Sequence, residues 1–107
     1  MIRAPLQPFP DERGGETGVA AARERLEAAG VRPHAWSNGP GDRYAVHEHR
    51  TTKLLICAEG SITFLVGLGA EPVELTAGEG FVLPAGIRHA AVVGPEGCTC
   101  LEGHRPG

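Results

Sequence analysis

The chain beyond residue 30 consists of short runs in which apolar, β-branched and aromatic side chains alternate with polar ones. Turns that contain Gly or Pro separate these runs, a pattern typical of strands. Short strands with a turn every roughly 8–12 residues indicate a sandwich or barrel rather than an α/β fold. We expect a tight hairpin at Glu59-Gly60 and strands at 44–49, 53–58, 61–65, 73–75, 80–83, 89–93 and 98–101.

The segment 17–29 has a helical period, which predicts one helix before the strands. Gly30 suits the left-handed position that follows a helix, and Val31 is placed to fold back on Leu26. Such a helix would cover an edge or an end of the barrel. Its expected apolar face consists of Val19, Ala22, Leu26 and Ala29.

The length of 107 residues indicates a single domain. We expect an N-terminal arm and helix at 1–30, a barrel at 31–103 and a flexible tail at 104–107. The net charge of -3 and the lack of a basic cluster argue against a nucleic-acid partner. No apolar run approaches the ~20 residues of a membrane span. Residues 1–13 do not resemble a signal peptide, so we expect a cytoplasmic protein without a membrane partner.

Three cysteines, Cys57, Cys98 and Cys100, form an odd count without the spacing of a disulfide framework. Free thiols in a reducing compartment are therefore expected. Cys98 and Cys100 stand two positions apart and share one face of a strand. This placement favours packing over redox or metal chemistry.

Histidines supply the candidate chemistry. His47 and His49 stand two positions apart, so both project to the same face of an extended segment. His89 follows a Pro-x-Gly turn that begins another strand, which can bring its ring to the same place. Neutral imidazole is a common ligand of divalent transition metals, so these residues predict a metal site inside the barrel. His34 and His104 are expected at the surface or the rim.

The spacing of these residues resembles the two motifs of the cupin superfamily, whose members are small jelly-roll barrels. The match covers residues 41–93, and two motifs in register are far more specific than either alone. The resemblance implies an all-β, double-stranded β-helix with one N-terminal helix, as in small single-domain bacterial cupins. The motifs stand in this chain as Gly41-x5-His47-x-His49-x3-Lys53-x6-Gly60 and Gly78-x5-Pro84-x-Gly86-x2-His89.

The resemblance also implies a ligand set. Metal-binding cupins hold one divalent ion with two histidines and a glutamate of the first motif and the histidine of the second. The implied ligands of one Fe, Mn, Ni, Cu or Zn ion are therefore His47, His49 and His89. Lys53 replaces the glutamate, and Val93 stands where the second motif often has asparagine. Three imidazoles still suffice for an open catalytic metal site.

Lys53 is the only lysine beside nine arginines, and its role stays open at this point. As a catalytic residue it would act as a base, or as a cation that fixes an anionic substrate beside the metal. The alternative is an ion pair at the rim of the barrel, with Glu48, Glu59 or Glu79 as partner.

Strand alternation outlines a pocket. Leu55 and Cys57 share the inward face of Lys53, and Ala91 and Val93 continue inward from His89. A small apolar lining of this kind suits a modest ligand with few polar anchors. Ile62 and Phe64, which share a face of their own run, complete the expected lining.

Two classes of function fit this chain. The first is a metal-dependent oxygenase, isomerase or lyase that acts on a small molecule. The alternative is a non-catalytic barrel that binds or senses a small ligand and has a weak or vestigial metal site, or no retained activity. Because cupins commonly pair through sheet edges, the resemblance also implies a homodimer.

Overall fold

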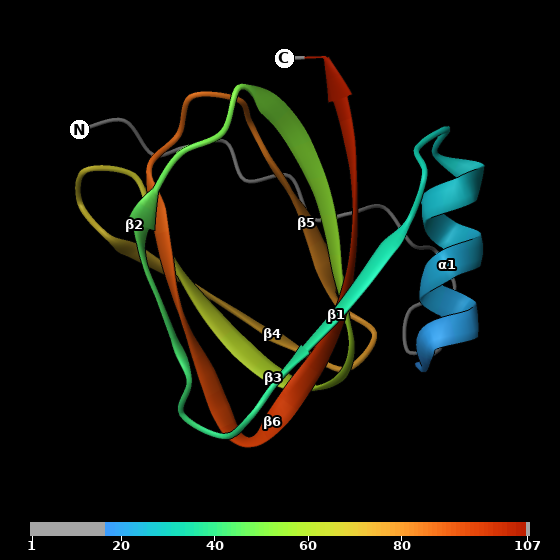
Figure 1. Cartoon of the computed structure of the whole chain (residues 1–107), viewed down its shortest axis with the longest axis horizontal. Coiled ribbons are helices and arrows are strands. Elements are labelled where there is room, and N and C mark those ends of the chain that lie inside the picture. Colours follow the sequence, from blue (N-terminus) through green and yellow to red (C-terminus); the bar gives the residue numbers. More distant parts are fainter. Residues whose placement is uncertain (1–16, 107) are drawn as a thin grey trace.

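The structure, a computed structural model, describes residues 17–106, which form one helix packed outside an antiparallel β-barrel (Figure 1). The fold is the expected double-stranded β-helix. The part of residues 1–30 that was expected to form an arm lies outside the described residues. The elements are α1 Val19–Ala28, β1 His34–Asn38, β2 Arg43–His47, β3 Thr51–Val66, β4 Glu71–Thr76, β5 Gly80–Leu83 and β6 His89–Pro106.

Two long strands, β3 and β6, pair with each other and form the framework of the barrel. The first half of β3 also pairs with β5, from Lys53 to Ile56, and its second half pairs with β4, from Ser61 to Val66. Likewise, β6 pairs with β2 through its first half and with β1 through its second half. Each long strand therefore contributes to both sides of the barrel.

The hairpin predicted at Glu59-Gly60 is wrong, because these residues lie inside the continuous strand β3. The β3–β6 register shifts on both sides of Glu59-Gly60, which marks a β-bulge. Gly60 has φ 75°, and a Cβ at this position would lie 2.0 Å from the carbonyl oxygen of Gly97. The glycine therefore serves a bend and a close backbone crossing rather than a turn. The runs predicted as separate strands at 89–93 and 98–101 are likewise two parts of β6.

The C-terminal end also departs from the sequence prediction. A flexible tail was expected from residue 104, but β6 continues to Pro106. Its last residues pair with the start of β3, as His104 opposite Lys53 and Pro106 opposite Thr51. The backbone hydrogen bonds of this ladder hold the segment in place, although its Gly and Pro residues are unusual for a strand.

Alternation along β3 divides the apolar residues between two clusters. Leu55 and Cys57 point into the barrel, as predicted, and belong to the interior cluster together with Cys100. Leu54 and Ile56 point outward and pack against the helix. The outer cluster also contains Ala22, Leu26, Val31, Ala58, Val82 and Leu101.

Helix α1 ends as the sequence predicts. Gly30 has φ 87°, and the amide of Val31 donates a hydrogen bond of 3.2 Å to the carbonyl oxygen of Leu26. Val31 packs with Leu26 in the outer cluster, which completes the Schellman arrangement. All three cysteines are free and buried, in agreement with the packing role expected of them. Among the described residues no helix has the length and apolar character needed to cross a membrane.

Candidate metal centre

Three histidines converge at one point of the barrel, as the sequence predicts. His47 is the last residue of β2 and His89 the first of β6, and the register of these strands places the two opposite each other. His49 lies just beyond the end of β2. The ring centroids of His47 and His89 are 4.3 Å apart, and that of His49 lies 4.8 Å from His47 and 5.2 Å from His89. One nitrogen of each ring lies within 4.8 Å of the others, which is close enough to share an ion.

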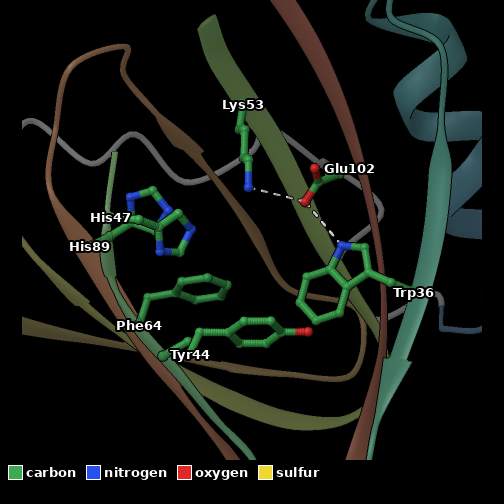
Figure 2. Close-up of a pocket in the computed structure, with 8 residues that line it drawn as sticks. Trp36, Tyr44, His47, Lys53, Phe64, His89 and Glu102 are labelled. Carbon is green, nitrogen blue, oxygen red and sulfur yellow. Dashed lines mark hydrogen bonds and ion pairs between the residues drawn. The ribbon is translucent and has the colours of Figure 1, made fainter. Parts of the chain in front are cut away.

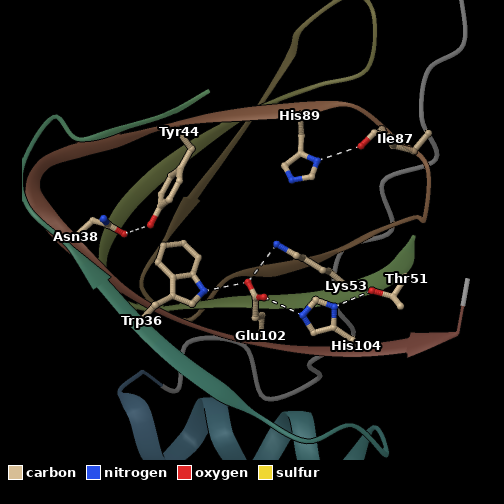
Figure 3. A network of polar contacts seen from close by, with 9 residues as sticks. All are labelled: Trp36, Asn38, Tyr44, Thr51, Lys53, Ile87, His89, Glu102 and His104. Carbon is tan, nitrogen blue, oxygen red and sulfur yellow. Dashed lines mark hydrogen bonds and ion pairs between the residues drawn. The ribbon is translucent and has the colours of Figure 1, made fainter. Parts of the chain in front are cut away.

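Backbone carbonyls orient two of these rings. Nδ1 of His47 lies 2.7 Å from the carbonyl oxygen of Ala45. Nδ1 of His89 lies 3.0 Å from that of Ile87, a contact drawn in Figure 3. Because a carbonyl oxygen only accepts, Nδ1 carries the proton in both rings and Nε2 keeps a free lone pair. Such an outer hydrogen bond is the usual support of a metal-ligating imidazole.

The inner nitrogens have no protein partner. Nε2 of His49 and Nε2 of His89 are both buried and form no hydrogen bond. A buried polar atom without a partner is costly, so its retention calls for an explanation. A divalent metal ion bound by these lone pairs would supply one, and the residues present therefore fit such an ion.

The site favours neutral imidazoles. Burial lowers the pKa of His49 and of His89 from the ordinary value, and the nearby charge of Lys53 lowers both further. The neutral ring is the form that binds a metal, so the fold keeps these side chains in the competent state near neutral pH. His47 is the most exposed of the three residues.

Lys53 lies inside the barrel rather than at its rim. Only 8% of the residue is exposed, and its Nζ lies 3.4 Å from Oε1 of Glu102 (Figure 2). An ion pair was one of the predicted roles of Lys53, but Glu48, Glu59 and Glu79 were the wrong partners. Glu102 was not among the residues predicted from the sequence. Alternation along β6 offers the signal, because Glu102 follows the inward-facing Cys100 by two positions.

Glu102 is the centre of a network of polar contacts (Figure 3). Trp36 donates from Nε1 to Oε1 at 3.0 Å, and Nε2 of His104 lies 3.0 Å from Oε2. The other ring nitrogen of His104 lies 2.8 Å from the hydroxyl of Thr51. Burial raises the pKa of Glu102, but the charge of Lys53 and the hydrogen bonds of Trp36 and His104 outweigh it, so the net shift is downward. Glu102 is therefore an ionised carboxylate at neutral pH.

A pocket of about 180 Å³ opens beside the histidines. It is more aromatic and more polar than predicted, because Trp36, Tyr44 and Glu102 contribute to its wall. Leu55, Cys57, Ile62 and Val93 lie in the interior core instead of lining the pocket. Figure 2 shows the rings of Tyr44 and Phe64 on the side of the pocket away from Lys53, and the ring of Trp36 beside Glu102. The lining residues are Trp36, Tyr44, His47, Lys53, Phe64, His89, Ala91 and Glu102.

Solved structures with this fold include several at 26% sequence identity. An RmlC-like cupin from Shewanella frigidimarina NCIMB 400 has a TM-score of 0.62, with 72% of this chain and 67% of that chain covered. An uncharacterized conserved protein with a double-stranded β-helix domain from Klebsiella pneumoniae subsp. pneumoniae has a TM-score of 0.61, with 70% and 62% covered. A chain from the structures of the DMSP lyases RdDddP and RnDddQII has a TM-score of 0.65. That match covers 72% of this chain but only 39% of the lyase chain.

No curated protein shows significant similarity to the chain. The family model of the cupin domain matches residues 30–103. This match spans more than half of the sequence and includes His47, His49 and His89, whose rings converge in the structure. The chain belongs to the cupin family.

Proposed function

We propose that this cupin binds one divalent metal ion through His47, His49 and His89 and uses it to transform a small molecule. The convergence of three ring nitrogens, two of them buried without a partner, carries the proposal. Imidazole ligands suit Fe, Ni, Cu and Zn, whereas Mn, the fifth candidate, usually has more oxygen ligands. A bound ion would supply Lewis acidity and an activated water at its open positions.

The pocket beside the histidines is the proposed substrate site. Its volume of about 180 Å³ suits a small molecule, with apolar contacts from Phe64 and Ala91. Oxygenation, isomerisation and lyase chemistry are all compatible with an open ion held by three imidazoles. The likeness to the structures of DMSP lyases supports lyase chemistry among these three, at 26% identity. We also propose Lys53 as a catalytic residue, because Lys53 lines the same pocket.

The second candidate is a non-catalytic barrel that binds or senses a small ligand. Lys53 favours it, because an ammonium group beside the histidines opposes a divalent cation. In this case the ion would bind weakly, and the pocket would select its ligand without chemistry. The affinity of the site for metal separates the two candidates.

Metal binding to protein without a histidine tag tests the proposal. We expect Zn²⁺, Ni²⁺, Cu²⁺ or Fe²⁺ to bind with a stoichiometry of one and to raise the melting temperature. His47→Ala and His89→Ala should each weaken binding by about 100-fold or more, since each removes a ligand. His34→Ala is the matched control, because His34 is an exposed residue of β1. Weak binding that is equally insensitive to all three substitutions would favour the non-catalytic candidate.

A homodimer in the cytoplasm completes the proposal. Among the described strands, β1, β2, β4 and β5 each pair with one neighbour only, so each has an edge that a second copy could extend. Val46 on β2 is 59% exposed, which gives one of these edges apolar character. Three free, buried thiols are compatible with a reducing compartment. Light scattering on purified protein would give the oligomeric state.

A further inference from the structure

The charges around the histidines are unusual for a site that holds a divalent cation. The three candidate ligands are imidazoles, which bring no negative charge when neutral. Among the residues that line the pocket, Glu102 is the only carboxylate, and it already bonds to Lys53 and Trp36 there. Figure 2 shows the ammonium group of Lys53 between Glu102 and the histidine rings. A cation rather than a carboxylate therefore faces the ion site.

Lys53 has hydrogen-bonding capacity left for a ligand. A lysine ammonium has three donors, and the contact with Glu102 at 3.4 Å uses at most one of them. The residue is only 8% exposed, so bulk water does not surround the remaining donors. In such an environment a donor with a positive charge attracts an anion more strongly than it would in water.

We propose that the ligand of this site is a small carboxylate, which binds between the metal ion and Nζ of Lys53. The inference rests on the proposed function, because half of the binding site is the ion itself. The carboxylate would complete the charge that three neutral imidazoles leave unbalanced. The apolar remainder of the molecule would contact Phe64, Ala91 and the ring of Trp36. The pocket of about 180 Å³ is smaller than the roughly 300–1,000 Å³ of pockets that hold drug-sized ligands, so the molecule must be small.

Binding of the anion and of the metal should be coupled. A carboxylate that contacts both the ion and Lys53 reduces the repulsion between these two cations. By linkage, the anion then tightens metal binding by the same factor by which the metal tightens anion binding. If Lys53 and Glu102 form only a structural pair, a carboxylate has no such effect, and this difference makes the proposal testable.

The experiment measures the Zn²⁺ affinity of the full chain by competition with a chromophoric chelator, at constant ionic strength. Acetate is the probe, and acetamide is its uncharged control of the same shape. We expect acetate to tighten Zn²⁺ binding about fivefold to tenfold, in the usual range of coupling between sites, and acetamide to have no effect. A titration of the chelator alone, with and without acetate, gives the effect of acetate on the chelator's own Zn²⁺ affinity. The measured shift is corrected for that effect.

Substitutions of Lys53 provide the decisive comparison. Lys53→Met removes the cation and keeps the length, so Zn²⁺ alone should bind about tenfold more tightly while the acetate effect disappears. Lys53→Arg keeps the cation and should keep the coupling, which guards against a general disturbance of the pocket. Arg105→Met, at an exposed position of β6, is the matched control and should behave as the wild type.

The outcomes separate this inference from the function on which it rests. Wild-type protein that binds Zn²⁺ with an affinity independent of acetate overturns the carboxylate proposal and leaves the metal site standing. Retention of the full acetate effect by Lys53→Met overturns the carboxylate proposal in the same way. A wild type that binds no Zn²⁺, with or without acetate, overturns both.

Discussion

Nζ of Lys53 on β3 lies 3.4 Å from Oε1 of Glu102 on β6, and the two side chains meet inside the barrel. A buried ammonium group without a partner would be strongly unfavourable. Glu102 therefore explains how a lysine can occupy the position where the cupin motif has a glutamate. In the cupin motif, one glutamate both faces the ion and supplies a negative charge. In this chain Lys53 faces the ion site, and Glu102 supplies the negative charge.

Glu102→Gln should destabilise the fold by about 3 kcal/mol, because it leaves the ammonium group of Lys53 buried without its anion. Urea denaturation at pH 7 measures the change in the free energy of unfolding. Glu96→Gln is the control, since Glu96 is an exposed residue of β6, and it should change stability by less than about 0.5 kcal/mol. Equal effects of the two substitutions would show that the pair contributes nothing specific.

The same carboxylate predicts how stability depends on acid. The pKa of Glu102 is lower in the folded protein than its ordinary value of 4.5. Its contribution is therefore complete above about pH 4.5 and is lost as the pH falls through the lower value of the folded state. Trp36→Phe removes one donor to Glu102 and should raise this pKa, so the variant loses less stability between pH 4.5 and the acid transition. Denaturation curves at several pH values below about 5 test the prediction, and parallel curves for both proteins would contradict it.

Much of this fold was accessible from the sequence because local signals and the global structure agree. The helix, its cap at Gly30 and the convergence of the histidines follow from periodicity, turn chemistry and motif spacing. The hairpin prediction at Glu59-Gly60 failed because a glycine at positive φ serves a bulge and a hairpin equally well. Only the long-range contact with Gly97 decides between them.

The polar half of the site could not be assigned for a related reason. No spacing rule links Lys53 to Glu102, because the contact depends on the register between β3 and β6. That register shifts at the bulge, and β6 extends past the residue where the sequence suggested a tail. Trp36 reaches Glu102 from a third strand, β1. Alternation along β6 indicates that Glu102 shares the inward face of Cys100, but it does not indicate which side chains of other strands meet it.

Gly60→Ala should be far more damaging than a typical glycine substitution. The new Cβ would lie 2.0 Å from the carbonyl oxygen of Gly97, and the backbone has φ 75°. Gly67→Ala provides the matched control, because Gly67 has φ 79° but nothing within 4 Å of its Cβ position. We expect a loss of about 1 kcal/mol for Gly67→Ala from backbone strain alone. Gly60→Ala should cost about 3 kcal/mol or more, since the crossing of β3 and β6 must also open. If urea denaturation gave similar losses in the free energy of unfolding for both variants, the backbone at the crossing of β3 and β6 would shift without cost to admit the new Cβ.

Lys53→Glu restores the carboxylate of the cupin motif and tests whether position 53 reaches the proposed metal ion. If it does, Zn²⁺ should bind more tightly than to Lys53→Gln, which removes the positive charge without adding a ligand. We expect a further gain of about tenfold, or ~1.4 kcal/mol, in competition titrations. The single substitution also places two carboxylates side by side, because Glu102 remains, so the metal-free protein should lose stability. Adding Glu102→Gln should recover that stability and keep the gain in affinity. Equal affinities for Lys53→Glu and Lys53→Gln would mean that residue 53 acts on the ion only through its charge, at a distance beyond direct coordination.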